Sequence, residues 1–525
     1  MNRLCRLSLA WVLLLGSTLA SAASRPNILL IMADDMGFSD AGCYGGEIKT
    51  PHLDQLAEGG VRFTQFYSTG RCWPSRAALL TGYYPQQVRR DKFNDTQLGN
   101  RPGWAPLVPV HLKAAGYRTY HSGKWHLDGK PLQNGFDQSY SLHDQDRFFT
   151  PTKHFLDDEA LPQPTTDSGY YATTAIADHA VETLEDHHAN FADRPFFHYL
   201  AFTAPHFPLH ALQEDIDRYR DRYLEGWDVV RQARWERLRE QGLIDTPLPP
   251  RNPEIKPPYN LTWEELEDRI GPGEAPDAVA WSELSETQKH FQATKMAIHA
   301  AMVDRMDQEI GRVLDLLREM DALENTLVLF VSDNGASAEQ IIRADEHNKS
   351  AVPGTAESYL CLGPGFSTAA NTPFRLHKSW THEGGIASPL IVHWPAGFTA
   401  RGKLRHQPGH FVDIVPTILA AVGITPAVGE QGPQAPGTSL LPAIENNQDH
   451  TPDCLWWHHE GRSAIRVGDW KAVKREDPST WSLYDMKTDR GEMNDRANTY
   501  PGTLANLTDR WEALARQFRA NATMK

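Results

Sequence analysis

Apolar positions along the chain follow two patterns that alternate over most of its length. Continuous apolar runs, such as residues 28–32, predict strands buried on both faces of a parallel sheet. Amphipathic stretches predict helices, and the longest covers about residues 286–320, with one apolar face made by Met302, Met306, Ile310, Val313 and Leu317. Further strands are predicted at residues 117–121, 196–202 and 326–331, and further helices at residues 51–58, 108–115 and 175–184. The alternation predicts an α/β fold with a large, mostly parallel mixed sheet that helices cover on both faces.

Two parts of the chain break this alternation. Residues 211–280 contain a charged helical piece and a proline-rich connection, which predict an insertion over the surface, near the mouth of a site. From about residue 454, short aromatic segments separated by turn residues precede a helical stretch at residues 504–518. They predict a small antiparallel sheet with one helix. We therefore expect a large unit at residues 23–450 and a C-terminal α+β unit at residues 451–525.

The first residues have the pattern of a secretory signal. Arg3 and Arg6 flank the apolar run at residues 7–19, and small residues follow at 20–22. The run is too short to span a bilayer comfortably, and no later apolar segment approaches the length of a transmembrane helix. The sequence predicts a signal peptide at residues 1–22 and an exported protein, periplasmic or secreted, that has no membrane anchor after cleavage.

Charge and cysteine content limit the partners and the cross-links. The formal net charge of −15 argues against nucleic acid, and an anionic substrate needs a local cationic site to attract it. After signal cleavage four cysteines remain: Cys43, Cys72, Cys361 and Cys454. Because Cys72 is assigned to chemistry below, Cys43, Cys361 and Cys454 can form at most one disulfide, and the sequence does not select the pair.

Polar residues suited to metal binding follow two of the predicted strands. Asp34-Asp35 comes after the first strand, and Asp333-Asn334 comes after the strand at residues 326–331. In α/β sheets, ligands gather at the carboxyl ends of strands. Three carboxylates and one amide oxygen are hard donors that suit Ca²⁺ or Mg²⁺ better than zinc. The alternative is that each pair only forms a strand-to-loop turn.

The most specific motif is the segment from Arg71 to Gly82. Cys72 is followed by Pro74 and Arg76 at the start of a predicted helix. A structural cysteine, or a thiol nucleophile activated by the helix N-terminus, is the alternative interpretation. The segment resembles the signature of the type I sulfatase family, in which a maturation enzyme oxidises the cysteine to formylglycine.

Further motifs follow in that family's order along nearly the whole mature chain. The resemblance is carried by Asn27 to Asp35, Gly123-Lys124-Trp125-His126, Ala204-Pro205-His206-Phe207-Pro208, Ser332-Asp333-Asn334-Gly335, and Lys378 before Glu383-Gly384-Gly385. The segment from Asn371 to Arg375 and the insertion after His210 resemble those of bacterial arylsulfatases in particular.

The resemblance implies an alkaline-phosphatase-like fold and a sulfuric ester hydrolase of the arylsulfatase type. It implies one Ca²⁺, with Mg²⁺ less favoured, and the metal ligands Asp34, Asp35, formylglycine at Cys72, Asp333 and Asn334. It implies the catalytic residues Cys72, Arg76, Lys124, His126, His206 and Lys378. A hydroxyl of the formylglycine hydrate then forms a covalent sulfate ester, and the second hydroxyl drives its release. The expected partners are an aryl, alkyl or carbohydrate sulfate and the enzyme that matures Cys72.

Several alternatives stay open. Relatives that share this site hydrolyse phosphonate monoesters or phosphodiesters, and a protein whose Cys72 stays unconverted would only bind sulfated glycans. Ser139 and Ser141 are both candidates for a substrate contact, as is neither. His458-His459-Glu460 fits no zinc spacing, so we interpret it as a strand and loop with one residue near the substrate mouth.

Overall fold

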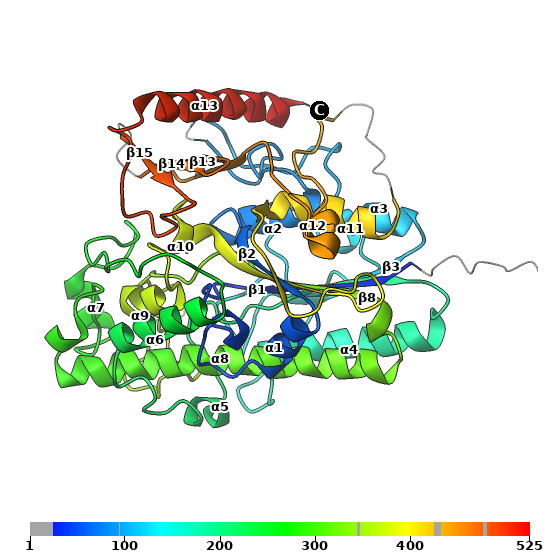
Figure 1. Cartoon of the computed structure of the whole chain (residues 1–525). Coiled ribbons are helices and arrows are strands. Elements are labelled where there is room, and N and C mark those ends of the chain that lie inside the picture. The colour runs from blue at the N-terminus through cyan, green and yellow to red at the C-terminus, as the bar shows by residue number, and fades with distance from the viewer. Residues whose placement is uncertain (1–24, 94, 344–346, 425–431, 476–479, 525) are drawn as a thin grey trace, which may run out of the picture.

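The computed structural model describes the whole chain except residues 1–24, 94, 344–346, 425–431, 476–479 and 525. The predicted signal peptide, residues 1–22, therefore lies outside the described residues. Within the part that is described, the chain forms a large sheet of 11 strands and a small sheet of four. Figure 1 shows helices on both sides of the large sheet, with the small sheet and α13 (Pro501–Thr523) stacked beyond one of these helical layers.

The middle of the large sheet is parallel and its two margins are mixed. The five parallel strands are, in spatial order, β8 (Thr326–Ser332), β1 (Asn27–Ala33), β7 (Phe196–Ala201), β3 (Arg118–Lys124) and β4 (Gln138–Leu142). Antiparallel β9 (Ala387–His393) joins β8 to β2 (Val61–Tyr67), which pairs in parallel with β10 (Lys403–Arg405) and β11 (Gly409–His410). On the other side, β5 (His154–Leu156) and β6 (Glu159–Ala160) continue antiparallel from β4. The predicted mostly parallel mixed sheet is confirmed.

The central strand β1 shows why this segment folds as a buried strand. Leu29 and Ile31 pack into the apolar core on one face of the sheet, and Ile28, Leu30 and Met32 pack into the core on the other. All five side chains are inaccessible to solvent. A continuous apolar run is the sequence that such a two-sided burial requires, because successive strand residues point to opposite faces.

Each face of the sheet has its own helical layer. On one face lie α1 (Pro51–Glu58), α4 (Ala172–Asn190) and α8 (Glu286–Glu319), and α8 begins with a capping box between Ser285 and Gln288. The opposite face carries α2 (Cys72–Thr81), α3 (Val108–Ala114), α11 (Ile414–Ala421) and α12 (Leu441–Asn446). Short helices α9 (Gly363–Ala370) and α10 (Glu383–Ile386) precede β9. Single 3₁₀ turns are η1 (Gly42–Tyr44), η2 (Leu132–Asn134), η4 (Leu323–Asn325) and η5 (Phe411–Asp413).

The predicted insertion covers one end of the molecule. It contains α5 (Gln213–Asp217), α6 (Trp227–Glu240) and α7 (Trp263–Arg269), and η3 (Trp281–Glu283) follows it directly. Trp227 packs edge-on against Phe366 of α9, with ring centroids 5.5 Å apart. The connection before α7 brings Tyr259 to Arg71, whose Nη1 donates a hydrogen bond to the Tyr259 hydroxyl at 2.8 Å. The insertion therefore reaches the residue next to Cys72.

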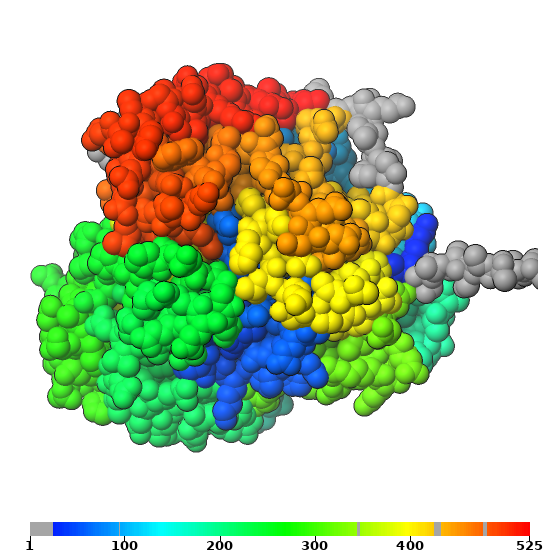
Figure 2. Space-filling model, in the orientation of Figure 1, coloured from blue at the N-terminus to red at the C-terminus, as the bar shows by residue number. Residues whose placement is uncertain are grey.

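The C-terminal part is the small antiparallel sheet and helix that the sequence predicts. Its strands follow chain order: β12 (Leu455–His459), β13 (Arg462–Val467), β14 (Trp470–Lys474) and β15 (Trp481–Asp485). Trp511 of α13 stacks on Trp456 with ring centroids 5.4 Å apart. Figure 2 shows the orange-red surface of this part meeting the green surface that includes the insertion. No helix among the described residues has the length and apolar character needed to cross a bilayer.

Candidate active site and metal centre

The two acidic pairs meet where β1 and β8 end. These strands pair in register, with Ala33 opposite Ser332, so Asp34-Asp35 leaves the sheet beside Asp333-Asn334. The Asp35 backbone N–H donates to Asp333 Oδ1 at 3.2 Å, and Asn334 Nδ2 donates to Asp35 Oδ1 at 2.7 Å. All four side chains are buried. The register of one pair of parallel strands thus builds a single cluster of oxygens.

Cys72 joins this cluster from the neighbouring layer. The chain leaves the carboxyl end of β2 and enters α2, whose first residue is Cys72. Its Sγ and one carboxylate oxygen each of Asp34 and Asp333 all lie within 4.8 Å of one another. The side chain is 2% exposed, and burial raises the pKa of the thiol although Lys124 and Lys378 oppose that shift. The thiol is therefore not a preformed thiolate.

Three cationic side chains surround the carboxylates. One helical turn after Cys72, Arg76 Nη2 lies 2.9 Å from Asp333 Oδ2 and 3.7 Å from Asp34 Oδ2. Lys124, the last residue of β3, forms an ion pair with Asp34, and Lys378 Nζ lies 2.8 Å from Asp35 Oδ2. Each of the three carboxylates therefore has a cationic partner within the cluster.

The two predicted histidines lie on the loops after β3 and β7. His206 Nε2 is 3.8 Å from Asp35 Oδ2, and its Nδ1 contacts the Phe207 carbonyl. His126 has a left-handed backbone with φ of 51°, and its buried Nδ1 has no hydrogen-bond partner among the described residues. Burial, reinforced by the nearby lysines, holds the pKa of both imidazoles well below 6.5. Both rings are therefore neutral near pH 7.

The oxygen cluster fits a divalent cation. Asp34 Oδ1 and Asn334 Oδ1 are buried and have no hydrogen-bond partner among the residues described. Burial and the adjacent Asp333 raise the pKa of Asp34 to about 6, and burial also raises the pKa of Asp35. A bound cation would stabilise the ionised form of these buried carboxylates. Carboxylate and amide oxygens are also the ligands that Ca²⁺ and Mg²⁺ prefer.

Comparison with known proteins gives the family. The sulfatase family matches residues 26–424. An uncharacterized sulfatase of Schizosaccharomyces pombe is 31% identical over 93% of this chain and 93% of its own length. The chain belongs to the sulfatase family.

Other relatives of this sulfatase have named activities. An arylsulfatase of Klebsiella aerogenes is 30% identical over 81% of this chain and 93% of its own. A human N-acetylgalactosamine-6-sulfatase is 28% identical over 87% of this chain and 73% of its own. The crystal structure of Ps i-CgsB in complex with k-i-k-neocarrahexaose covers 95% of this chain and 94% of its own, with a TM-score of 0.67 and 24% identity, which shows a shared fold. The protein is a sulfuric ester hydrolase, and the expectation of this enzyme class is confirmed.

Sequence reasoning missed a second layer of side chains around Lys378. Glu339 Oε2 lies 3.2 Å from Lys378 Nζ, and Glu339 Oε1 accepts from Arg71 Nη1 at 2.9 Å. Arg71 Nη1 also donates to Ser379 Oγ at 2.6 Å. A single acidic residue in a loop has no periodicity or spacing, so nothing in the sequence distinguishes Glu339 from a surface glutamate.

The histidine cluster of β12 forms no metal site in the described part of the sulfatase. His459 Nδ1 pairs with Asp91 Oδ2 at 3.0 Å. Among the described residues, neither group with metal-ligand geometry includes His458, His459 or Glu460. The His459 ring instead packs 5.5 Å from the Trp73 ring, and Trp73 lies 5.7 Å from the His126 ring. The C-terminal unit therefore reaches the wall beside the candidate nucleophile.

The remaining sequence expectations concern cysteines and serines. Cys43, Cys72, Cys361 and Cys454 are all free thiols. Ser139 Oγ hydrogen-bonds His121 Nδ1 at 2.9 Å, whereas buried Ser141 Oγ has no partner among the described atoms.

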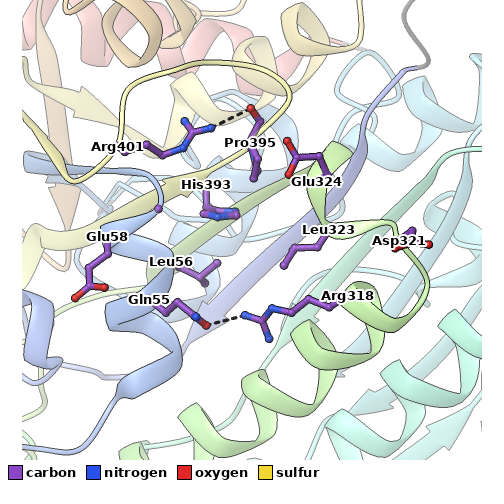
Figure 3. Close-up of a pocket in the computed structure, with 11 residues that line it drawn as sticks. Gln55, Leu56, Glu58, Arg318, Asp321, Leu323, Glu324, His393, Pro395 and Arg401 are labelled. Atoms are coloured by element: carbon purple, nitrogen blue, oxygen red, sulfur yellow. Dashed lines mark hydrogen bonds between the residues drawn. The ribbon is translucent and has the colours of Figure 1, made fainter.

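A large cavity of about 620 Å³ lies at the opposite edge of the sheet, where β9 ends at His393 and α8 is followed by η4 (Figure 3). It contains none of the predicted site residues. The predicted site residues thus form a buried polar cluster apart from that cavity.

Proposed function

We propose that the protein hydrolyses a sulfate ester through formylglycine made from Cys72. The observation that carries this proposal is the position of Cys72 Sγ beside carboxylate oxygens of Asp34 and Asp333, with Arg76 and Lys124 paired to the same carboxylates. A thiol whose pKa is raised is a poor nucleophile. A hydrated aldehyde at this position offers two hydroxyls within the same shell of cations.

A calcium ion fits the ligands Asp34, Asp35, Asp333 and Asn334 together with the modified residue 72. When bound, it supplies positive charge that lowers the pKa of a formylglycine hydroxyl and stabilises anionic sulfate oxygens. Calcium is preferred to magnesium on family resemblance, and the hard oxygen ligands suit either ion.

The first half-reaction breaks the ester bond. One hydroxyl of the hydrate, ionised by loss of its proton to water, attacks sulfur in line. The sulfur–oxygen bond to the leaving group breaks, and a sulfate ester forms on residue 72. Arg76 and Lys124 stabilise the sulfate oxygens. The leaving oxygen takes its proton from Lys378 or His206. Since the Phe207 carbonyl accepts from Nδ1 of His206, Nε2 must gain a proton to donate, and a bound anion favours that charged form.

The second half-reaction restores the enzyme. His126, neutral because its pKa is low, accepts the proton of the remaining hydroxyl. The carbon–oxygen bond to sulfate breaks, inorganic sulfate leaves, and the aldehyde reforms and takes up water. A serine at this position has no second hydroxyl. It could form the sulfate ester, but it could not release sulfate by reforming an aldehyde.

The substrate class proposed is an aryl or carbohydrate sulfate, since relatives at 30% and 28% identity are named arylsulfatase and N-acetylgalactosamine-6-sulfatase. Competing turnover of an aryl sulfate and an aryl phosphonate monoester tests the choice of sulfate. Faster turnover of the phosphonate would overturn it.

The proposal of formylglycine is tested by a mass spectrum of the tryptic peptide from Cys72 to Arg76, in protein made by its native host. We expect an aldehyde in place of the thiol, and protein from a host without maturation enzymes serves as the control. An unmodified Cys72 from a host with active maturation would refute the mechanism.

Export of the protein, with cleavage after about residue 22, remains part of the proposal. The N-terminal sequence of protein recovered from the periplasm or the medium tests it, and retention of residues 1–22 in a cytoplasmic protein would contradict it.

A further inference from the structure

A cavity of about 230 Å³ lies at the edge of the large sheet that also carries the candidate active site. Its walls come from segments that follow β4, β6 and β7 and from the segment before α9. The lining side chains include Asp146, Arg147, Phe149, Gln163 and Tyr359. Because β4 and β7 are parallel to β1, the loops after them lie at the same carboxyl edge as Asp34 and Asp35.

Side-chain contacts connect this cavity with His206. Both carboxylate oxygens of Asp146 accept from Arg343 Nη1 at 2.9 Å. The Arg343 guanidinium carbon lies 5.1 Å from the centroid of the Phe207 ring, which stacks 4.2 Å from the His206 ring. The Tyr359 ring on the cavity wall is 6.5 Å from that of Phe207. Phe207 thus lies between the cavity wall and the group that faces the leaving oxygen.

The charged groups on the cavity wall are already paired. Asp146 is held by Arg343, and Arg147 Nη1 lies 2.7 Å from Asp144 Oδ2. A charged ligand group would have to compete with these ion pairs while losing its own hydration, which is costly. The cavity therefore favours an uncharged ligand.

The wall also offers hydrogen-bonding groups beside aromatic surface. Tyr359 is 2% exposed, and its hydroxyl has no hydrogen-bond partner within the described part of the chain. Burial raises the pKa of Tyr359, so the hydroxyl stays a neutral donor. Half-buried Phe149 presents a ring, and exposed Gln163 presents an amide that donates to the Thr150 carbonyl at 3.2 Å. Apolar rings with a few polar groups suit a ligand that has apolar faces and hydroxyl edges.

We propose that this cavity binds the uncharged sugar unit next to the sulfated unit of an oligosaccharide substrate, a role that rests on the proposed sulfatase function. The sulfated unit occupies the site at Cys72, and its neighbour extends past Phe207 into the cavity. The enzyme then discriminates oligosaccharide sulfates from sulfated monosaccharides and from aryl sulfates.

The test measures kcat/KM for 4-nitrophenyl sulfate, for sulfated hexosamines and galactose, and for tetrasaccharides of keratan sulfate and carrageenan in which an uncharged sugar is next to the sulfated unit. We expect the preferred tetrasaccharide to exceed its sulfated monosaccharide by at least about tenfold, worth about 1.4 kcal/mol of transition-state binding. Tyr359→Phe and Gln163→Ala should each remove most of the excess of kcat/KM for the tetrasaccharide over kcat/KM for 4-nitrophenyl sulfate. Gln55→Ala, in the remote cavity of Figure 3, should keep the wild-type ratio.

The outcomes separate this inference from the function on which it rests. Turnover of 4-nitrophenyl sulfate with no gain from monosaccharide to tetrasaccharide overturns the sugar site and leaves the sulfatase function standing. An unchanged ratio in both variants, with thermal unfolding that matches the wild type, overturns it as well. Absence of turnover of every sulfate by protein with verified formylglycine overturns the proposed function itself.

Discussion

Glu339 and Lys378 form a buried ion pair, with Oε2 and Nζ 3.2 Å apart. Lys378 is also held by Asp35 at 2.8 Å, and Glu339 by Arg71 at 2.9 Å. Glu339 therefore links the ammonium group of Lys378 to Arg71, the residue before Cys72. We regard Glu339 as a positioning residue, since it acts through Lys378.

Replacing Glu339 by Gln should lower kcat/KM about tenfold, equivalent to about 1.4 kcal/mol. The amide cannot neutralise Lys378 and Arg71 together, so both side chains lose their fixed positions. We expect kcat to fall more than KM rises, because the proposed role of Lys378 is to act on the leaving oxygen. Steady-state kinetics with 4-nitrophenyl sulfate measure the effect, and Glu324→Gln in the remote cavity is the control. Wild-type kcat in Glu339→Gln would contradict the assigned role.

The same pair predicts how stability depends on pH. Burial alone favours a neutral Glu339, but the charges of Lys378 and Arg71 lower its pKa below the ordinary 4.5. A lowered folded-state pKa means that the stabilisation is complete above the unfolded value and declines as the pH falls below it. The thermal midpoints of wild type and Glu339→Gln should therefore differ near neutral pH and converge below about pH 4.5. A difference that grows on acidification would show that Glu339 is not ionised in the folded protein.

Replacing Cys72 by Ser should leave an enzyme that traps sulfate. If the residue stays serine, its hydroxyl can form the sulfate ester but cannot expel sulfate by reforming an aldehyde. We expect mass spectrometry after incubation with an aryl sulfate to find one sulfate group on the peptide from residue 72 to Arg76, with turnover lost. Cys454→Ser, which changes a half-buried free thiol elsewhere, should retain activity. Sustained turnover by Cys72→Ser protein, with the serine verified as unmodified, would refute the release step.

Replacing Asn334 by Ala should weaken metal binding by at least about tenfold, because even the loss of an outer-shell partner weakens metal sites by about that factor. The change removes an oxygen that has no hydrogen-bond partner among the described atoms, and it also frees Asp35 Oδ1. Titration of chelator-treated protein with Ca²⁺, followed by the thermal midpoint, measures affinity without relying on activity. Stabilisation by Mg²⁺ alone would refute the choice of calcium.

Replacing Lys471 by Met should lower the free energy of unfolding by about 3 kcal/mol. Lys471 of β14 is fully buried, and its Nζ lies 2.9 Å from Glu383 and 2.8 Å from Glu492. Methionine fills the space but leaves two buried carboxylates without this cation. Urea unfolding measures the effect, and Lys403→Met on the exposed end strand should change stability by less than about 0.5 kcal/mol. A loss in Lys471→Met no larger than in this control would show that the buried pair contributes little.

Much of the large sheet could be predicted because its strands are strongly patterned. The five apolar residues at 28–32 can be buried on both faces only as a central strand, and they occupy that position in β1. The long helix predicted at about residues 286–320 is α8, Glu286–Glu319, since its apolar face repeats with the helical period. Local patterns of this kind predict the structure because burial in the core requires apolar residues at these positions.

The candidate site was predictable only as separate pieces. Asp34 and Asp333 could each be assigned to the end of a strand, yet their approach depends on β1 and β8 being neighbours in register. Glu339 and the cavity beside Phe207 could not be found at all, because a loop residue has no pattern that reports its partners.

The sequence by itself determined the fold class, the buried strands, and the polar residues that follow those strands. The tertiary structure alone decided which distant side chains meet: Glu339 with Lys378, Tyr259 with Arg71, and Trp73 with His459. The physical reason is that hydrophobic periodicity is a local property of the chain. Contacts between loops depend instead on strand order, on register and on the packing of every layer at once.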